Sequence, residues 1–169
     1  MSRPMLNAVD FGLLECLERN GRQSFATLAA ENGLSKTPCW TRVQAMEEAG
    51  VIRGYRADID PAALGLSVIA HVQVVIDASQ RAAFEAAVMN DPAIHECHSI
   101  AGEADYLFKI ACRDVEALDD LLRDQLTLLP GVTRTHTTIS LKVIKPPAPL
   151  SRAVRNLRPA PKADTRAGR

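Results

Sequence analysis

The sequence predicts an α+β protein, helical in its first third and alternating between strands and helices after that. Apolar residues recur every three or four positions over residues 8–49, which is the period of an amphipathic helix. From residue 68 onward, stretches of alternating apolar residues are interleaved with two helical stretches. Asp60, Pro61 and Gly65 mark a linker between these two parts.

The first part is predicted to form three short helices. The first spans residues 8–20, and Asn7 can cap its N-terminus. The second begins after Ser24 and stops at residues 32–33, an Asn-Gly pair that favours a left-handed C-terminal turn. The third begins at its N-cap candidate Ser35 and runs to about residue 49.

The third helix is predicted to be amphipathic, with Cys39, Val43 and Met46 facing the core at spacings of four and three. Residues 51–59 follow it and are predicted to form a short hairpin with its turn near Gly54.

The second part has the element order βαββαβ, the ferredoxin-like split βαβ arrangement. Its predicted elements, in order, are strand 68–76, helix 81–89, strands 94–101 and 106–112, helix 115–129 and strand 132–141. The chain therefore divides into an N-terminal domain over residues 1–60, a linker over 61–67 and a ferredoxin-like domain over 68–145. Residues 146–169 are rich in Pro and Arg and are predicted to form a disordered basic tail.

Charge is distributed unevenly, although the net charge is zero. Residues 1–65 carry seven Lys/Arg against eight Asp/Glu, and residues 66–149 carry seven against eleven. Residues 150–169 carry six against one. Any contact with nucleic acid must therefore come from a local basic surface, helped by assembly of several copies or by the tail.

The cysteines show no metal-binding or secreted-framework spacing, which favours reduced thiols in a cytoplasmic protein. They are Cys16, Cys39, Cys97 and Cys112. The N-terminus does not resemble a signal peptide, and no apolar run approaches the ~20 residues of a membrane-spanning helix.

Two short helices joined by a tight glycine-containing turn, with a supporting helix before and a hairpin after, form the pattern of a winged helix-turn-helix. Such a domain binds DNA through the polar side of its third helix, and the wing can add basic residues. The candidate DNA-binding residues are Ser35, Lys36, Thr37, Trp40, Thr41, Arg42, Gln44, Arg53 and Arg56. An ordinary three-helix domain with a solvated polar face is the alternative, and Trp40 could instead pack on the first helix.

Several motifs together resemble the Lrp/AsnC, or feast/famine, family of transcriptional regulators. They are Leu34-Ser35-Lys36-Thr37-Pro38-Cys39 leading into Arg42-Val43; Glu47-x-x-Gly50-x-Ile52-x-Gly54-Tyr55; Glu96-Cys97-His98 followed by Gly102-Glu103-Ala104-Asp105-Tyr106-Leu107; and Leu129-Pro130-Gly131-Val132. The resemblance covers residues 9–145. It implies dimers formed by pairing sheets, assembly of dimers into octamers, and an amino-acid effector bound between dimers near the loop joining the second and third strands.

Carried onto this chain, the effector site comprises His98, Ser99, Ala101, Gly102, Glu103, Asp105 and Thr137. Glu103 and Asp105 can accept hydrogen bonds from an ammonium group, and amides near Gly102 or the hydroxyls of Thr137 and Ser140 can bind a carboxylate. Family members often have Asp where this chain has Glu103. The alternative for this loop is an ordinary hairpin turn with solvated acids.

These observations predict a sequence-specific transcriptional regulator that responds to an amino acid or a related metabolite and controls genes of amino-acid metabolism or transport. An architectural, DNA-wrapping nucleoid protein is the alternative. We expect no cofactor apart from the effector and no metal, because His95 and Cys97 point to one face of their strand and His98 to the other. We expect no catalysis, since hydrolase and phosphate-binding motifs are absent and Cys39 lies on the buried side of its helix.

Overall fold

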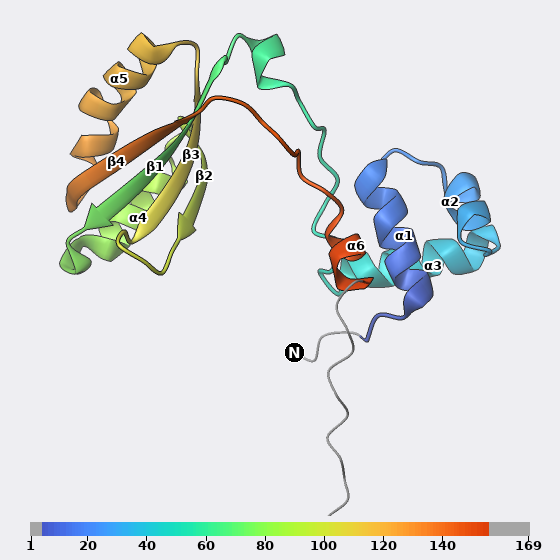
Figure 1. The fold of residues 1–169 in the computed structure, drawn as a ribbon. Helices are drawn as coiled ribbons and strands as arrows, with labels where there is room; N and C mark the ends of the chain where they lie inside the picture. Colours follow the sequence, from blue (N-terminus) through green and yellow to red (C-terminus); the bar gives the residue numbers. More distant parts are fainter. Residues whose placement is uncertain (1–4, 156–169) are drawn as a thin grey trace, which may run out of the picture. The chain divides into compact units, whose positions relative to one another are not determined.

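A computed structural model describes residues 5–155 and divides them into two compact units (Figure 1). The N-terminal unit comprises residues 5–57 together with 145–155, and the sheet unit comprises Asp58–Ile144. Each unit has its own cluster of buried apolar side chains.

Three helices form most of the N-terminal unit: α1 (Ala8–Arg19), α2 (Phe25–Glu31) and α3 (Lys36–Glu48). The predicted caps of the first two are confirmed. Asn7 and Asp10 form a reciprocal capping box on α1, and the Ser24 hydroxyl accepts from the amide of Thr27 on α2. Their buried core consists of Leu13, Cys16, Leu28, Ala29, Cys39, Val43 and Met46.

The turn between α2 and α3 depends on Gly33, whose φ of +66° lies in the left-handed region. The amide of Leu34 then donates back to the carbonyl of Ala29 at 2.9 Å, which closes the end of α2. This compact turn confirms the predicted helix-turn-helix geometry.

The predicted hairpin over residues 51–59 is wrong, since this segment contains no strand and has no regular secondary structure. The amides of Val51 and Ile52 both donate to the carbonyl of Met46, at 2.9 and 3.1 Å, and close the C-terminus of α3. These donors are therefore used to cap a helix instead of pairing two strands. Arg53 and Arg56 are exposed on this irregular segment.

The sheet unit has the predicted βαββαβ order. Its elements are η1 (Pro61–Leu64), β1 (Val68–Ile76), η2 (Ala78–Gln80), α4 (Arg81–Met89), β2 (Ile94–Ser99), β3 (Tyr106–Cys112), α5 (Val115–Asp124), η3 (Leu126–Leu128) and β4 (Val132–Ser140). The strands form one sheet in the order β2-β3-β1-β4, and every neighbouring pair is antiparallel. This order is that of the ferredoxin-like fold.

One face of the sheet is covered by α4 and α5, and the apolar core lies beneath these helices (Figure 1). Strand alternation places Val72, Phe108 and their same-face neighbours in this core, together with Phe84 of α4. The opposite face carries polar side chains in register, including Glu96, Lys109 and His71 on adjacent strands.

The predicted helix over residues 115–129 is shorter than expected, because α5 ends at Asp124 and a 3-10 turn follows. The turn allows Leu126 to be fully buried. The predicted apolar stripe is otherwise confirmed: Leu118 and Leu121 are buried, and Leu122 and Leu129 pack against them.

The predicted disorder of the tail is wrong for residues 150–155, which form the short helix α6 (Leu150–Arg155) beside α1 in the N-terminal unit (Figure 1). The carboxylate of Glu18 accepts hydrogen bonds from the first amides of this helix, so the segment gains partners that composition does not reveal. The rest of the predicted tail, residues 156–169, lies outside the described part of the chain.

Candidate nucleic-acid interface and ligand loop

Helix α3 presents a polar face outward, as its pattern predicts. Cys39, Val43 and Met46 are at most 4% exposed and hold the helix against α1 and α2. The exposed side carries four predicted site residues within two turns: Lys36, Thr37, Trp40 and Thr41. Half of the Trp40 surface is accessible (50%), so the indole belongs to this exposed side.

Arg42 has a role that the sequence analysis missed. Its Nη1 donates to Oδ1 of Asp10 at 2.8 Å, which joins α3 to α1. Asp10 is only 8% exposed, and its other oxygen accepts from the amide of Asn7 in the capping box. Because this pair links two helices next to a buried carboxylate, Arg42 helps to orient α3.

Gln44 is also engaged inside the unit. Its Nε2 donates to Oε2 of Glu47 at 2.6 Å, and the Tyr55 hydroxyl donates to Oε1 of the same carboxylate at 2.7 Å. Partial burial and this hydrogen bond raise the pKa of Tyr55 to about 12. The phenol therefore remains a donor at neutral pH and ties the segment after α3 to the helix.

The N-terminal end of α3 is exposed. Ser35 occupies the N-cap position, but its hydroxyl makes no capping hydrogen bond to the helix. Thr41 donates to the carbonyl of Thr37 at 3.1 Å, so its hydroxyl oxygen retains lone pairs for a further donor. These groups suit contacts with phosphate oxygens and base edges.

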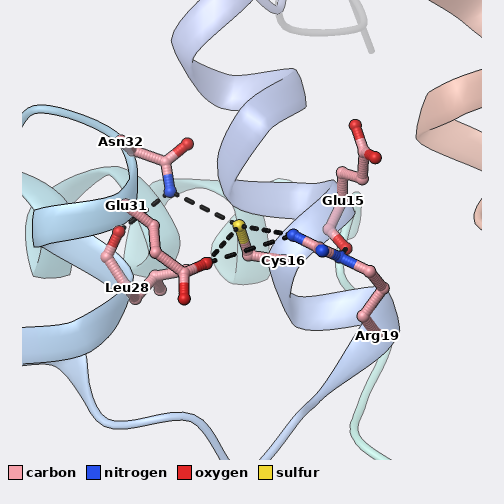
Figure 2. A network of polar contacts seen from close by, with 6 residues as sticks. All are labelled: Glu15, Cys16, Arg19, Leu28, Glu31 and Asn32. Carbon is pink, nitrogen blue, oxygen red and sulfur yellow. Dashed lines mark hydrogen bonds and ion pairs between the residues drawn. The ribbon is translucent and has the colours of Figure 1, made fainter.

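A polar network joins α1 to α2 around Cys16 (Figure 2). The buried thiol donates to Oε2 of Glu31 at 3.2 Å and accepts from Arg19 and Asn32 at 3.5 and 3.6 Å. Hydrogen bonds from Gln23 and Cys16 lower the pKa of Glu31. The network borders an open cavity of about 410 Å³ at the corner between the two helices, and sequence reasoning did not identify it.

In the sheet unit, the predicted ligand loop, which is the connection over residues 100–105 between β2 and β3, is fixed by Asp105. Its amide donates to the carbonyl of Val74 at 3.0 Å, and its carboxylate Oδ2 accepts from the amide of Ile76 at 3.0 Å. Its carbonyl accepts from Ile100 at 2.9 Å, which closes the loop. Asp105 is therefore partly structural, whereas Gly102 and Glu103 are exposed at the tip.

The predicted effector residues do not all come together within one chain. His98, Ser99 and Ala101 lead into the loop along β2, at one edge of the sheet. Thr137 lies on β4 at the other edge, beside Val72 on the helix-covered face. His98 pairs with Leu107 and lies on the opposite face of the sheet. Thr137 is therefore separated from His98, Ser99 and Ala101.

Arg134 is the residue that the structure adds to this loop. Arg134 lies on β4, where it pairs with Val75 of β1. Its Nη2 lies 3.5 Å from the carbonyl oxygen of Glu103. The structure thus places the guanidinium of Arg134 beside the exposed tip of the loop, which carries the Glu103 carboxylate. The contact spans 31 residues of sequence, so no local motif could indicate it.

The potential metal ligands on β2 interact with one another and with Lys109 of β3. Glu96 lies 2.9 Å from Lys109, 3.4 Å from His98 and 3.9 Å from His95. The hydrogen bond from Lys109 holds the pKa of Glu96 below its usual range. Over residues 5–155, no three His, Cys, Asp or Glu side chains form a group suited to a metal ion. Within the same range, no helix is long and apolar enough to cross a bilayer.

Two family models match the two halves of the chain. A winged helix-turn-helix DNA-binding model matches residues 6–53, and the Lrp/AsnC ligand binding domain matches residues 67–150. The chain is 37% identical over 143 residues to the leucine-responsive regulatory protein of Haemophilus influenzae, covering 83% of this chain and 86% of the relative. It is 36% identical over 143 residues to the proline dehydrogenase transcriptional activator of Rhodobacter capsulatus, covering 83% and 93%.

Solved structures agree with these matches. A Neisseria meningitidis transcriptional regulator in complex with L-methionine superposes with a TM-score of 0.83 at 31% identity, covering 86% of this chain and 96% of the other. Escherichia coli AsnC superposes with a TM-score of 0.79 at 27% identity, covering 86% and 98%. The feast or famine regulatory protein of Mycobacterium tuberculosis, complexed with L-methionine, gives 0.78 at 32% identity, covering 84% and 96%.

Proposed function

The chain belongs to the Lrp/AsnC family of transcriptional regulators, and from that premise we propose how its two units divide DNA binding and ligand sensing. The observation that carries the proposal is the outward polar face of α3 in a chain that also holds the family's ligand-binding domain. This α3 face enters the major groove, where side chains distinguish base pairs. Lys36, Thr37, Trp40 and Thr41 make its contacts.

Other predicted DNA-binding residues have different roles in this proposal. Ser35 binds a backbone phosphate at the start of α3, and Arg53 and Arg56 contact phosphates beside the groove. Arg42 and Gln44 act as positioning residues, because their side chains already bind Asp10 and Glu47.

The ligand loop is proposed to bind the backbone groups of an L-amino acid. The exposed carboxylate of Glu103 accepts from the ammonium group, with Asp105 supporting the loop from beneath. Amides near Gly102 and the guanidinium of Arg134 bind the carboxylate, while His98, Ser99 and Ala101 border the site. L-methionine is the first candidate, since two similar structures hold it.

A second copy completes the site in this proposal. Thr137 lies at the far edge of the sheet from His98, so it can join a ligand pocket only across an interface between copies. We propose a homodimer formed by sheet pairing and a higher assembly, the octamer being the expected form. The assembly acts at the nucleoid in the cytoplasm on genes of amino-acid metabolism or transport, without a catalytic step.

Ligand binding is tested by thermal-shift measurements of the full chain with each of the twenty L-amino acids. A ligand that prefers the folded state raises the melting temperature. We expect L-methionine or a similar residue to raise it, and Glu103→Gln to abolish that rise. Glu116→Gln is the matched control, since Glu116 is exposed on α5 away from the loop. A full response in Glu103→Gln would place the ligand elsewhere.

DNA binding is tested by fluorescence anisotropy on two duplexes of equal length. One comes from the region upstream of a gene of amino-acid metabolism or transport, and the other has a random sequence. We expect preference for the former, at least tenfold weaker binding for Thr41→Ala, and wild-type binding for Thr127→Ala, an exposed threonine of the sheet unit. Equal affinity for both duplexes, unchanged by any amino acid, would instead support the architectural, DNA-wrapping function.

A further inference from the structure

We propose that mild acid weakens the homodimer, because His71 and His136 lie on the open face of the sheet, which a second copy covers. This inference rests on the homodimer proposed above. It adds the face of the sheet that is used, the groups that make the contact sensitive to protons, and the direction of the response.

The open face, which is the side of the sheet opposite α4 and α5, has the composition of an interface (Figure 1). Apolar side chains of the two central strands lie on it and are only partly buried, namely Ile69, Val75, Leu107 and Ala111. An apolar centre with a polar rim is typical of contacts between proteins. Four strands about 4.8 Å apart and about 25 Å long present roughly 500 Å² of flat sheet. Side chains standing on it raise the accessible area toward the ~800 Å² that each partner of a standard interface buries.

Charge favours a second copy as the partner. The four strands hold three fixed charges, and the register places all of them on the open face: Glu96 of β2, Lys109 of β3 and Arg134 of β4. The two outer strands therefore have opposite signs. A two-fold axis parallel to the strands sets β2 of one copy over β4 of the other, so that each acidic edge faces a basic edge.

The strand register brings two histidines together on this face. His71 of β1 pairs with Thr138 of β4. Two residues further along, Gln73 pairs with His136, so His71 and His136 are diagonal neighbours on adjacent strands. They occupy β1 and β4, within the area that a second copy covers.

The charged groups nearest to these histidines in the register are cations. Lys109 of β3 pairs with His71, and Arg134 lies two residues from His136 on the same side of β4. Within residues 5–155, no carboxylate forms an ion pair with either imidazole, whereas Glu96 lies 3.9 Å from His95 and 3.4 Å from His98. A proton on His71 or His136 therefore adds a positive charge that no neighbouring acid balances.

The other titratable groups on this side of the sheet have partners of their own or lie in the ligand loop. They are Glu96, His95, His98, Glu103 and Asp105. Glu96 lies 2.9 Å from Lys109 and can balance a proton on His95 or His98. The carboxylate of Asp105 accepts from the backbone of β1, and Glu103 is exposed at the loop tip.

Protonation and docking therefore oppose each other. Histidine is the side chain that ordinarily changes charge between pH 5 and 8. The fixed charges of the strands give the open face +1, and protonation of His71 and His136 raises it to +3 in each copy. A second copy brings an equal charge close and removes water from the imidazolium, and both effects disfavour the charged form. The dimer thus holds fewer protons than two free copies, so it weakens as the pH falls through the histidine range.

The test measures the dissociation constant of the dimer at about pH 7.5 and about pH 5.5, by fluorescence-detected sedimentation of the full chain. We expect a rise of at least tenfold at the lower pH in the wild type, and little change in the double variant His71→Gln, His136→Gln. His95→Gln is the matched control and should keep the wild-type response, since Glu96 balances that proton. Added salt should restore part of the wild-type affinity at the lower pH, because it screens the repulsion.

Equal wild-type dissociation constants at the two pH values, or an equal rise in the double variant, would overturn the proposal. Far-UV circular dichroism at both pH values separates dissociation from unfolding. Loss of structure at the lower pH would assign the rise to unfolding and also overturn it. A wild-type chain that is monomeric at the higher pH would instead contradict the homodimer of the proposed function itself.

The choice of face is tested separately with Gln73→Arg, which adds a cation between Leu107 and His136 on the open face. We expect the dimer to bind at least tenfold more weakly at the higher pH. Ala82→Arg adds the same charge at an exposed position of α4, on the other side of the sheet, and should leave the affinity unchanged. Wild-type affinity in Gln73→Arg would assign the pairing to strand edges and contradict the open face as the contact.

Discussion

The two units of this regulator are stabilised in different ways. The sheet unit has a core of thirteen buried side chains, in which Phe84 stacks on Phe108 with ring centroids 5.9 Å apart and lies 4.7 Å from the ring of Tyr106. The N-terminal unit has seven, and none of them is aromatic. Its helices are joined in addition by polar pairs, namely Asp10–Arg42, Cys16–Glu31 and Glu18–Ser151.

This difference shows how a DNA-binding helix can keep a polar face exposed while its orientation in the fold is fixed. An apolar stripe alone fixes only one side of α3, and polar pairs on its flanks fix its rotation. A polar residue near the DNA face can therefore serve the fold, as Arg42 does. In the sheet unit, strand register and a larger apolar core orient the elements, and the Tyr106 hydroxyl of β3 adds one polar link to Glu85 and Arg81 of α4.

The largest expected effect is that of Phe84→Ala in the sheet unit. Truncating a fully buried phenylalanine should lower the free energy of unfolding by about 3 to 5 kcal/mol. Far-UV circular dichroism in urea reports both units, whereas the fluorescence of Trp40, the single tryptophan, reports the N-terminal unit. We expect the Trp40 transition to shift much less than the dichroism.

Met89→Ala is the control for this change, because Met89 is 84% exposed on the same helix. Equal shifts of both signals in Phe84→Ala would show that the units unfold together, and the contrast between them would lose its basis.

Arg42→Ala should have the next largest effect. It should lower the free energy of unfolding of the N-terminal unit by about 2 kcal/mol, because it leaves the buried carboxylate of Asp10 without its cation. Urea unfolding followed by Trp40 fluorescence measures it. Arg123→Ala, which removes an exposed ion pair with Asp119 in the sheet unit, should cost well under about 1 kcal/mol.

Asp10→Asn separates the two roles of Arg42. If Arg42 acts by orienting α3, Asp10→Asn should weaken DNA binding as Arg42→Ala does. Weakened binding in Arg42→Ala together with wild-type binding in Asp10→Asn would identify a direct contact with DNA.

Gly33→Ala is expected to destabilise the N-terminal unit by about 1 kcal/mol, since a side chain is disfavoured at a φ of +66°. Trp40 fluorescence in urea again provides the readout. Gly102→Ala in the ligand loop is the matched control, because its φ is not positive and no atom lies within 4 Å of an added Cβ. Similar losses at both positions would argue against backbone strain as the cause.

The smallest expected effect concerns Asp114, the N-cap of α5. Hydrogen bonds, chiefly from the amide of Ala117, lower the pKa of this carboxyl. A depressed pKa adds stability that is present above the unfolded value of about 3.9 and is lost as pH falls through the folded value. Asp114→Ala should therefore lower the melting temperature at pH 7 and leave it unchanged at pH 2, and equal lowering at both would exclude this linkage.

Periodicity predicted most of the fold. The strand at 68–76 and the helix at 81–89 have the predicted bounds, since apolar alternation and helical spacing are local signals. The irregular segment after α3, the end of α5 and helix α6 could not be predicted, because each depends on one distant or competing partner. For α6 that partner is Glu18, more than 130 residues away.

The candidate sites followed the same rule. The inward and outward sides of α3 came directly from helical spacing. The roles of Arg42, Asp105 and Arg134 depend on partners in other elements, namely Asp10, Ile76 and Glu103. Only the folded chain brings these groups together.

The central claim, that the exposed face of α3 meets DNA, is tested most directly by quenching of Trp40. The indole is half exposed and lies between Lys36 and Thr41 on this face. Acrylamide quenching is measured for the free chain and for the chain saturated with its duplex. We predict that bound DNA shields Trp40 and lowers the quenching constant at least twofold, whereas an unchanged constant at saturation would contradict the account.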